Sequence, residues 1–166
     1  KIKKIGEFSE KTPINLADRG RASVSANIGI VASGVSYLYV KEALKELNIN
    51  LPILKLGFFY PLPEKNIKDF IKNCKKVLVV EELEPFVEKE IRALVKESNC
   101  KLEIFGKSLP ASATPKALQA GLLPEIGEFN TEIVACAIAK LIGKKYQLKK
   151  KNQSSLSRRF PCLCPG

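Results

Sequence analysis

Glu81 and Glu82 are adjacent carboxylates whose type and position could do acid–base chemistry. They follow the apolar run 77–80, so we expect them at the carboxyl end of a buried strand, where enzymes can place carboxylates of different pKa. Adjacent residues leaving a strand point in opposite directions, which disfavours a shared proton. Pro85 then opens a helix, and carboxylates near a helix N-terminus complement its dipole. We therefore predict a helix-end or interdomain role for both, not catalysis.

The Ser33-Gly34 turn is a candidate phosphate site, because it lies between a predicted strand over 28–32 and a predicted helix over 36–47. A helix N-terminus at the carboxyl end of a strand can bind anions. The G-x-G-x-x-G fingerprint and the P-loop are both absent. A tight turn explains the glycine as well, so we favour a structural role.

An aromatic loop follows the next predicted strand. Phe58, Phe59 and Tyr60 precede Pro61-Leu62-Pro63 and could stack on a ligand or a base. The two prolines stiffen this loop, and aromatic residues are enriched where proteins contact one another. We predict that these aromatic residues, with the two glutamates above, form an interface with neighbouring domains.

Metal and nucleophile chemistry finds little support in the composition. The chain has no His, which removes the commonest general base and metal ligand. Cys162 and Cys164 provide two thiolates, whereas structural zinc needs four ligands. The other cysteines, at 74, 100 and 136, are isolated in the sequence, and such residues behave as small core side chains that stay reduced in the cytosol. We predict no catalytic residue and no metal site.

The net charge of +11 is concentrated at the end of the chain. From residue 133 onward there are eight Lys and Arg and no acidic residue, so the first 132 residues have 20 basic and 17 acidic side chains, a net charge of +3. The tail lacks the interleaved aromatic residues of nucleic-acid-binding segments, so we predict a solvated linker and disfavour nucleic acid as a partner. No apolar run approaches the roughly 20 residues of a membrane helix, and no signal peptide is evident, so we expect a cytoplasmic protein without a membrane partner.

A repeating strand–helix pattern positions these candidates. Predicted strands over 28–32, 52–56, 77–80 and 101–105 begin about 25 residues apart, and each step holds one strand and one helix. This is the βαβ repeat of a parallel sheet covered on both faces. The predicted fold is therefore α/β, with three α/β/α layers and a mainly parallel open sheet of four to five strands.

The remaining segments complete a three-part organisation. Residues 1–27 are predicted to be an N-terminal segment from an upstream linker, with turn residues at 12–13 and 18–20 and a candidate edge strand over 21–26. Residues 28–143 form the α/β domain, including a small helix over 114–120 and a last helix capped by Asn130 and ended by Gly143. Residues 144–166 form the basic linker. Because the chain starts at Lys1 and has no Met, we expect a fragment of a longer protein.

Several stretches, taken together and in order, resemble the alpha subunit of indolepyruvate ferredoxin oxidoreductases. They are residues 29–37, the segments 54–57 and 60–63, and residues 77–88, with further agreement at 106–110 and 127–134. The resemblance covers residues 28–142 and is to the family's middle domain, which is similar to the C-terminal domain of transketolase. Residues 159–166 resemble the entry into the family's thiamine diphosphate domain, where an Arg-Pro-Pro run leads into Cys-Pro-Gly-Cys-Pro-His. Cys164, Pro165 and Gly166 begin that motif, whereas Phe160 and Cys162 depart from it.

The resemblance implies an enzyme that oxidatively decarboxylates aryl pyruvates to aryl-acetyl-CoA and reduces ferredoxin. Thiamine diphosphate, Mg²⁺ and 4Fe-4S clusters serve that chemistry in the family. This chain has neither the Gly-Asp-Gly diphosphate motif nor a ferredoxin-like cysteine run, so we expect it to bind none of them, to be inactive alone and to have an architectural role. The implied partners are the other domains of the subunit, the beta subunit, ferredoxin and CoA.

Two alternatives remain open from the sequence. The chain could be the same domain of another 2-oxoacid ferredoxin oxidoreductase or of a transketolase-like enzyme. It could also be an independent nucleotide- or nucleic-acid-binding α/β module that uses Gly34 and the basic tail.

Overall fold

A five-stranded sheet with the order β1-β3-β2-β4-β5 organises the chain. The structure is a computed structural model that describes residues 1–18, 27–98, 101–108 and 121–147. Within these residues the elements are α1 (Ile2–Lys11), β1 (Leu16–Asp18), β2 (Ile28–Ser33), α2 (Ser36–Glu46), β3 (Ile53–Leu56), α3 (Glu64–Ile71), β4 (Lys76–Val80), α4 (Phe86–Glu97), β5 (Glu103–Phe105) and α5 (Thr131–Leu141).

Four of the strands run parallel. β2 lies at the centre, with Ile30 beside Ile53 of β3 and Leu78 of β4, and β5 extends the sheet beyond β4. β1 closes the other edge and pairs antiparallel with β3. In this order, β3 lies on one side of β2, and the chain then crosses from β3 to β4 on the other side of β2. This reversal creates a switch point between β2 and β4, where open α/β sheets most often bind ligands.

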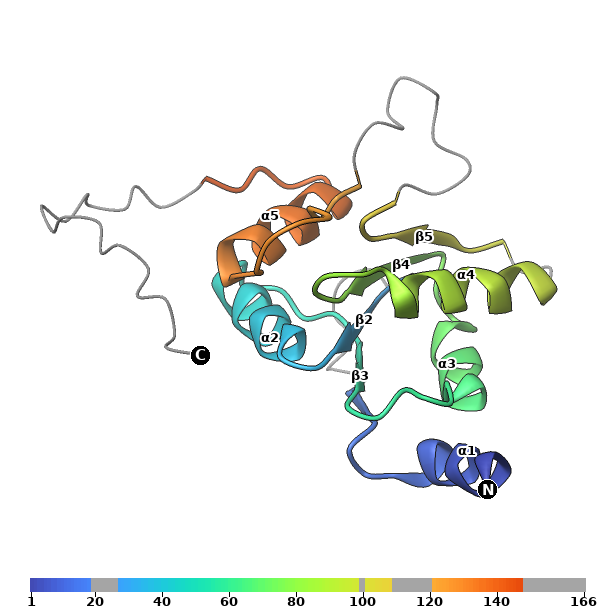
Figure 1. Ribbon diagram of the computed structural model, residues 1–166. Helices are drawn as coiled ribbons and strands as arrows, with labels where there is room; N and C mark the ends of the chain where they lie inside the picture. Colours follow the sequence, from blue (N-terminus) through green and yellow to red (C-terminus); the bar gives the residue numbers. More distant parts are fainter. Residues whose placement is uncertain (19–26, 99–100, 109–120, 148–166) are drawn as a thin grey trace, which may run out of the picture.

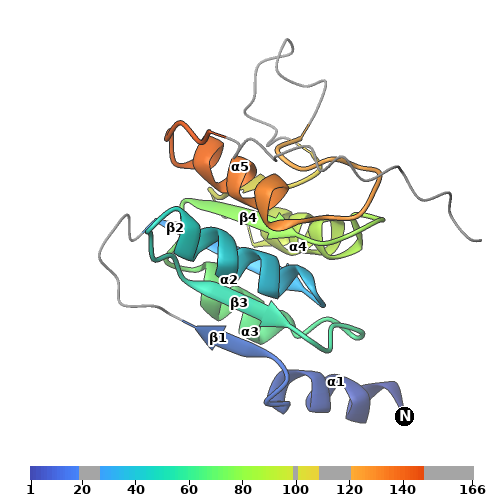
Figure 2. The ribbon, with the colours of Figure 1, turned by 90° about the vertical axis from the view of Figure 1, so that its left-hand side faces the viewer.

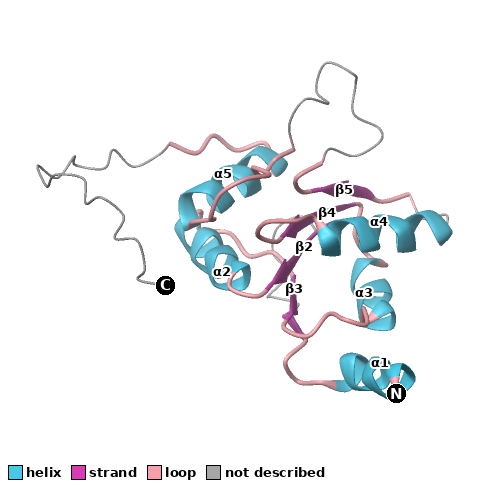
Figure 3. Cartoon of the chain, viewed as in Figure 1, coloured by secondary structure: helices cyan, strands magenta, loops and turns pink. Residues whose placement is uncertain are grey.

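Helices cover both faces of this sheet (Figures 1 and 3). Alternate residues of one strand point to opposite faces, so Ile30 of β2 packs beneath α2 and α5, whereas its neighbour Val31 packs beneath α3 and α4. β4 is divided in the same way, with Leu78 in the first cluster and Val79 in the second. Burial on both faces explains why these strands read as unbroken apolar runs.

The α/β prediction is confirmed in its class, layers and strand number. The four predicted strands correspond to β2–β5, and the predicted helix after Pro85 corresponds to α4. Asn130 caps α5 as predicted, since its side chain accepts a hydrogen bond from the Ile133 N–H at 2.9 Å. The small helix over 114–120 and the candidate edge strand over 21–26 lie outside the described residues.

The N-terminal segment differs from the prediction. Residues 2–11, predicted as part of a segment from an upstream linker, form the helix α1, and Asp18, predicted as a turn residue, ends the edge strand β1. In Figure 2, α1 lies beyond β1 at the end of the molecule opposite α5. Residues 16–18 therefore belong to the same sheet as the α/β domain, and α1 lies beside its edge.

Candidate functional site

The carboxyl end of β4 places Glu81 against the start of α4. Glu81 is buried, and its carboxylate accepts hydrogen bonds from the N–H groups of Val87 and Glu88, each at 2.8 Å. Pro85, at the N-cap, offers no side-chain cap, so Glu81 satisfies two helix N–H groups that would otherwise lack acceptors. This geometry agrees with the predicted helix-end role.

Burial raises the pKa of the Glu81 carboxyl, and this effect exceeds the opposing effects. The hydrogen bonds from the Glu88 and Val87 N–H groups lower the pKa, because they favour the carboxylate. The charge of Glu88 raises it further, and that of Lys107 lowers it. Glu81 is thus a buried residue with a structural role, and its carboxyl group is not open to a substrate.

Glu82 binds a different segment from its neighbour. It is half-buried, and its Oε1 accepts a hydrogen bond from the Phe129 N–H at 3.0 Å, in the loop before α5. The two adjacent carboxylates therefore hold the first turn of α4 and the α5 loop, respectively. Because their partners lie in different segments, the arrangement speaks against a pair that shares one proton.

A buried lysine completes this cluster. Lys107 is only 3% exposed, and its ammonium group donates a hydrogen bond to the Leu83 carbonyl and lies 5.3 Å from the centroid of the Phe129 ring. Leu83 has a φ of +56° and a side chain that is 69% exposed. Charged side chains at the carboxyl end of β4 and after β5 therefore bind backbone groups of the surrounding loops.

The sequence analysis missed one central residue of this edge, Glu88. Its side chain is 1% exposed, and Oε1 accepts hydrogen bonds from Arg92 Nε and Nη2 at 3.0 and 2.9 Å. The N–H groups of Lys107 and Ser108 also bond to it, at 2.8 and 3.1 Å. The sequence did contain a signal for the burial of Glu88, because this residue stands three positions before Ile91 and so lies on the apolar face of α4. Glu88 therefore joins α4 to the loop after β5.

The predicted aromatic loop lies beside this cluster. Phe58 packs edge-on against Phe8 of α1, with ring centroids 5.3 Å apart. Phe59 and Tyr60 both lie against Phe86 at the start of α4, at 6.0 and 6.3 Å. Tyr60 is 74% exposed, so the loop presents an aromatic surface to solvent.

The predicted contact residues thus fall into two groups. Glu81 is enclosed, and its carboxylate already accepts two hydrogen bonds. Tyr60 is open to a partner, and the partly exposed Phe86 lies against it. Leu83, in the turn before α4, is also exposed. Phe58 and Phe59 are half-buried between neighbouring elements. Sequence reasoning did not identify Leu83 and Phe86 as surface residues, although both follow the predicted strand end.

The Ser33-Gly34 turn has a conformational explanation. Gly34 has a φ of +56°, in the left-handed region that glycine occupies without a Cβ penalty. The next residue, Val35, is the N-cap of α2 and contributes no side-chain hydrogen bond. The turn therefore needs glycine for its backbone, which agrees with the structural role we favoured.

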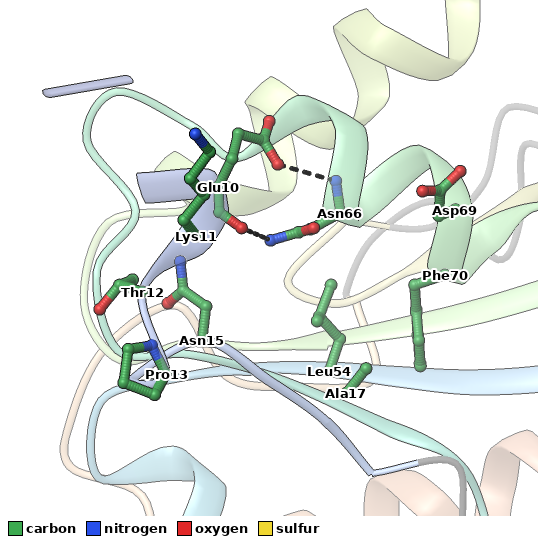
Figure 4. A pocket seen from close by; sticks show the side chains of 10 residues that line it. All are labelled: Glu10, Lys11, Thr12, Pro13, Asn15, Ala17, Leu54, Asn66, Asp69 and Phe70. Carbon is green, nitrogen blue, oxygen red and sulfur yellow. Dashed lines mark hydrogen bonds between the residues drawn. The ribbon is translucent and has the colours of Figure 1, made fainter. Parts of the chain in front are cut away.

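A pocket lies away from this edge, where α1 and β1 meet α3 (Figure 4). Its volume is about 350 Å³, and Leu54 and Phe70 contribute its apolar lining. The Glu10 carboxylate accepts hydrogen bonds from the N–H groups of Lys65 and Asn66 at 2.8 and 3.1 Å, while Asn66 Nδ2 donates to the Glu10 carbonyl at 2.8 Å. These groups are paired with one another, so the pocket is best explained as part of the joint between α1 and α3.

The described residues do not fit a metal centre or an iron–sulfur cluster. Cys74 follows α3 and Cys136 lies in α5, on opposite faces of the sheet. Burial raises the pKa of the Cys74 thiol, which disfavours the thiolate that a metal requires. Within the described part of the chain, no three potential ligands come together. The candidate residues Cys162, Cys164, Pro165 and Gly166 lie outside it.

Comparison with known proteins decides the family. A model of the indolepyruvate oxidoreductase domain matches residues 18–160. The indolepyruvate oxidoreductase subunit IorA of Archaeoglobus fulgidus is 37% identical over the whole chain, and that of Methanothermobacter thermautotrophicus is 34% identical. The chain belongs to the indolepyruvate oxidoreductase family. It spans about a quarter of the length of these relatives, 25% in both cases.

Solved structures confirm the transketolase-like fold of this indolepyruvate oxidoreductase domain. A split-gene transketolase, described as an inactive beta4 tetramer, matches 77% of the chain with a TM-score of 0.52 and 18% identity, over 43% of its own length. A 2-oxoglutarate:ferredoxin oxidoreductase from Magnetococcus marinus matches 77% of the chain with a TM-score of 0.50 and 20% identity, over 19% of its own length. Among the described residues, no helix is long and apolar enough to cross a membrane.

Proposed function

We propose that this chain is a non-catalytic structural and interface domain of an indolepyruvate ferredoxin oxidoreductase subunit. The complete enzyme would oxidatively decarboxylate aryl pyruvates to aryl-acetyl-CoA and pass electrons to ferredoxin. Thiamine diphosphate, Mg²⁺ and 4Fe-4S clusters would be bound by parts of the enzyme outside residues 1–166. The family match and the limited share of each relative that the chain spans support this division of labour.

The observation that carries the proposal is how the charged side chains at the carboxyl ends of the parallel strands are bonded. This is where an α/β domain usually presents catalytic or binding groups. Here Glu81 caps α4, Glu82 binds the Phe129 N–H, and Lys107 binds the Leu83 carbonyl. Each of these charged groups is engaged in holding the fold together, which suits a scaffold better than an active site.

The interface would be centred on the exposed aromatic and aliphatic residues of the same edge. Tyr60, Leu83 and Phe86 are 74%, 69% and 39% exposed. Tyr60 follows β3, whereas Leu83 and Phe86 follow β4 on the other side of β2. Exposed apolar side chains gathered in this way mark protein contacts, and Tyr and Phe are enriched in the buried cores of such contacts. The partners would be other domains of the same subunit or the beta subunit of the oxidoreductase.

Two measurements test this proposal. The isolated chain should show no thiamine diphosphate binding by calorimetry and no oxidation of indolepyruvate in the presence of CoA and ferredoxin. In the complete enzyme, Tyr60→Asp should weaken the association of domains or subunits, measured by sedimentation. Lys45→Asp, at an exposed position of α2, is the control. Turnover by the chain alone would refute the non-catalytic role, and unchanged assembly of Tyr60→Asp would refute the proposed interface.

A further inference from the structure

Two loops at the carboxyl edge of the sheet each expose an aliphatic side chain between glutamates. In the turn after β4, Leu83 stands between Glu82 and Glu84, and in the loop before α5, Ile126 is flanked by glutamates at positions 125 and 128. Leu83 and Ile126 are 69% and 89% exposed, respectively. Exposed apolar patches that are rimmed by polar residues mark contact surfaces.

The two loops are held against each other. Glu82 Oε1 accepts a hydrogen bond from the Phe129 N–H at 3.0 Å. The Lys107 ammonium group donates to the Leu83 carbonyl and lies 5.3 Å from the centroid of the Phe129 ring. The exposed side chains of both loops therefore form one surface, here called the acidic surface, which consists of Glu82, Leu83, Glu84, Glu125, Ile126 and Glu128.

The charge of the acidic surface has a single sign. Residues 77–88 contain four glutamates and residues 121–139 contain three, with no Lys or Arg in either segment, although the whole chain has a net charge of +11. Lys107, which lies between the two loops, is only 3% exposed and is already bonded to Leu83. Lys89, the first lysine after the turn, belongs to α4, on the opposite face of the sheet from α5. The acidic surface therefore favours a partner that combines cationic and apolar side chains.

The chain itself contains a segment of this chemistry. Residues 144–160 include seven Lys and Arg and no acidic residue, and apolar or aromatic side chains lie among them at positions 146, 148, 156 and 160. The structure describes this segment as far as residue 147. Tyr146 packs against the cluster on the α2–α5 face that also contains Leu123 and Phe129 of the loop before α5. The basic segment therefore begins on the face of the sheet to which this loop leads.

The residues that follow are numerous enough to reach the acidic surface. Residues 148–160 span at most roughly 45 Å when extended, whereas a domain of about 150 residues has a radius of gyration of about 15 Å. A covalent tether also gives such a segment an effective concentration on the order of millimolar. Contacts of low intrinsic affinity are therefore sufficient for docking within the chain.

We propose that residues 148–160 dock on the acidic surface of the same chain, with their lysines and arginines beside its glutamates and an apolar side chain between Leu83 and Ile126. The basic linker would thereby leave the domain in a fixed direction. Exposed ion pairs are individually weak and are screened by salt, so this docking is reversible and salt-sensitive.

This inference rests on the proposed function, because it treats the carboxyl edge as a contact surface. It names the occupant of the part of that edge around Leu83. Tyr60 and Phe86, which lie against each other, are left to the neighbouring domains.

Amide NMR spectra of the chain 1–166 test the docking. The amide resonances of residues 83–84 and 126–128 should shift when Lys149→Glu, Lys150→Glu and Lys151→Glu are combined, because the reversed charges release the segment. In the wild type, and not in this variant, the same resonances should shift when NaCl is raised from about 0.02 M to about 0.5 M.

A matched control makes the same change of charge elsewhere. Lys3→Glu, Lys4→Glu and Lys11→Glu are combined at exposed positions of α1, at the opposite end of the molecule from α5 (Figure 2). This variant should leave the resonances of the two loops in place.

Charge exchange provides a second test. The combination of Glu84→Lys, Glu125→Lys and Glu128→Lys should release the basic segment, which is measured as a loss of the ¹⁵N–¹H NOE of residues 148–160. Adding the three changes to Glu at 149–151 should restore this NOE, because opposite charges then face each other again.

The outcomes separate this inference from the function on which it rests. An equal response of the two loops to both lysine variants, or an NOE that the combined variant does not restore, would overturn the docking. Loop resonances that move only in the complete enzyme would assign the acidic surface to another domain and refute the linker as its occupant. The sedimentation test of Tyr60→Asp is independent of these spectra. Weakened assembly together with unmoved loop resonances leaves the interface function standing and refutes only the docking.

Discussion

The side chain of Asn15 binds both polar groups of the Phe58 backbone. Its Nδ2 donates to the Phe58 carbonyl at 2.7 Å, and its Oδ1 accepts from the Phe58 N–H at 2.9 Å. The same amide donates to the Ser9 carbonyl and accepts from the Gly57 N–H at 2.9 Å. One side chain thus joins α1 to the aromatic loop, so the N-terminal segment helps to fix the position of the surface around Tyr60.

Replacing Asn15 should therefore destabilise the domain. Asn15→Ala removes four hydrogen bonds and leaves partly buried backbone groups without partners, at a cost of about 2–4 kcal/mol in the free energy of unfolding. Urea unfolding measures this change. Asn73→Ala, at an exposed position after α3, is the control and should change stability by at most about 0.5 kcal/mol. Equal unfolding midpoints for the two variants would contradict the bridging role of Asn15.

The ion pair between Glu88 and Arg92 should matter far more than a similar pair on the surface. Glu88→Ala would leave Arg92 and the N–H groups of Lys107 and Ser108 without their acceptor, at a cost of about 3–5 kcal/mol. The control is the pair Glu64–Lys68, which has the same i,i+4 spacing but side chains that are 56% and 45% exposed. Breaking that pair with Glu64→Ala should cost about 0.5 kcal/mol or less. Similar losses in the two variants, measured by urea unfolding, would show that burial of Glu88 is not decisive.

The sequence was informative where hydrophobic periodicity sets the structure. The unbroken apolar runs of β2 and β4 predict strands buried on both faces, and these strands lie side by side at the centre of the sheet. Regular alternation of strands and helices predicts parallel pairing, because a helical crossover returns the chain to the end of the sheet from which the previous strand started. The capping role of Asn130 was also predictable, since a helix cap depends on residues only three positions apart.

Features that depend on distant contacts were not predictable from local pattern. α1 escaped prediction because it combines a glycine with basic residues in its first turn, and its position depends on Asn15 and Glu10 bonding to segments more than 40 residues away. The role of Glu88 depends on N–H groups 19 and 20 residues further along the chain. Sequence spacing reveals the Glu88–Arg92 pair, but not that the pair would be enclosed by the loop after β5.

Replacing Gly29 or Gly34 by alanine should destabilise the domain for different physical reasons. A Cβ at Gly29 would lie 2.9 Å from both Cys74 Sγ and the Phe70 ring, so Gly29→Ala forces the core beneath α3 to shift and should cost about 1–3 kcal/mol. A Cβ at Gly34 meets no atom within 4 Å, so Gly34→Ala should cost only the conformational strain of its positive φ, about 1–2 kcal/mol.

Combining each glycine variant with Cys74→Ala distinguishes the two mechanisms. Removal of the thiol should restore part of the stability lost in Gly29→Ala and none of that lost in Gly34→Ala, as measured in a double-mutant cycle by thermal unfolding. Additive effects at both positions would contradict the steric explanation for Gly29.

The raised pKa of Glu81 leads to a pH dependence with a defined sign. Burial makes the folded state bind a proton at Glu81 more tightly than the unfolded state does. Protonation of this residue therefore contributes stability that is fully present below the unfolded pKa, about 4.3, and is lost as the pH rises through the folded pKa. Glu81→Gln cannot titrate, and its amide can accept only one of the two helix N–H bonds with its single oxygen.

The free energy of unfolding of the wild type minus that of Glu81→Gln should therefore be larger at pH 4 than at pH 7. Urea unfolding at several pH values between these limits measures this difference. Glu84→Gln, the same substitution at an exposed position in the same turn, accounts for the loss of one negative charge. A difference that instead grew from pH 4 to pH 7 would mean that the hydrogen bonds from Val87 and Glu88 outweigh burial and hold Glu81 as a carboxylate. Its role at the end of β4 would then be to stabilise the helix dipole of α4 by its charge, rather than to fill a buried position.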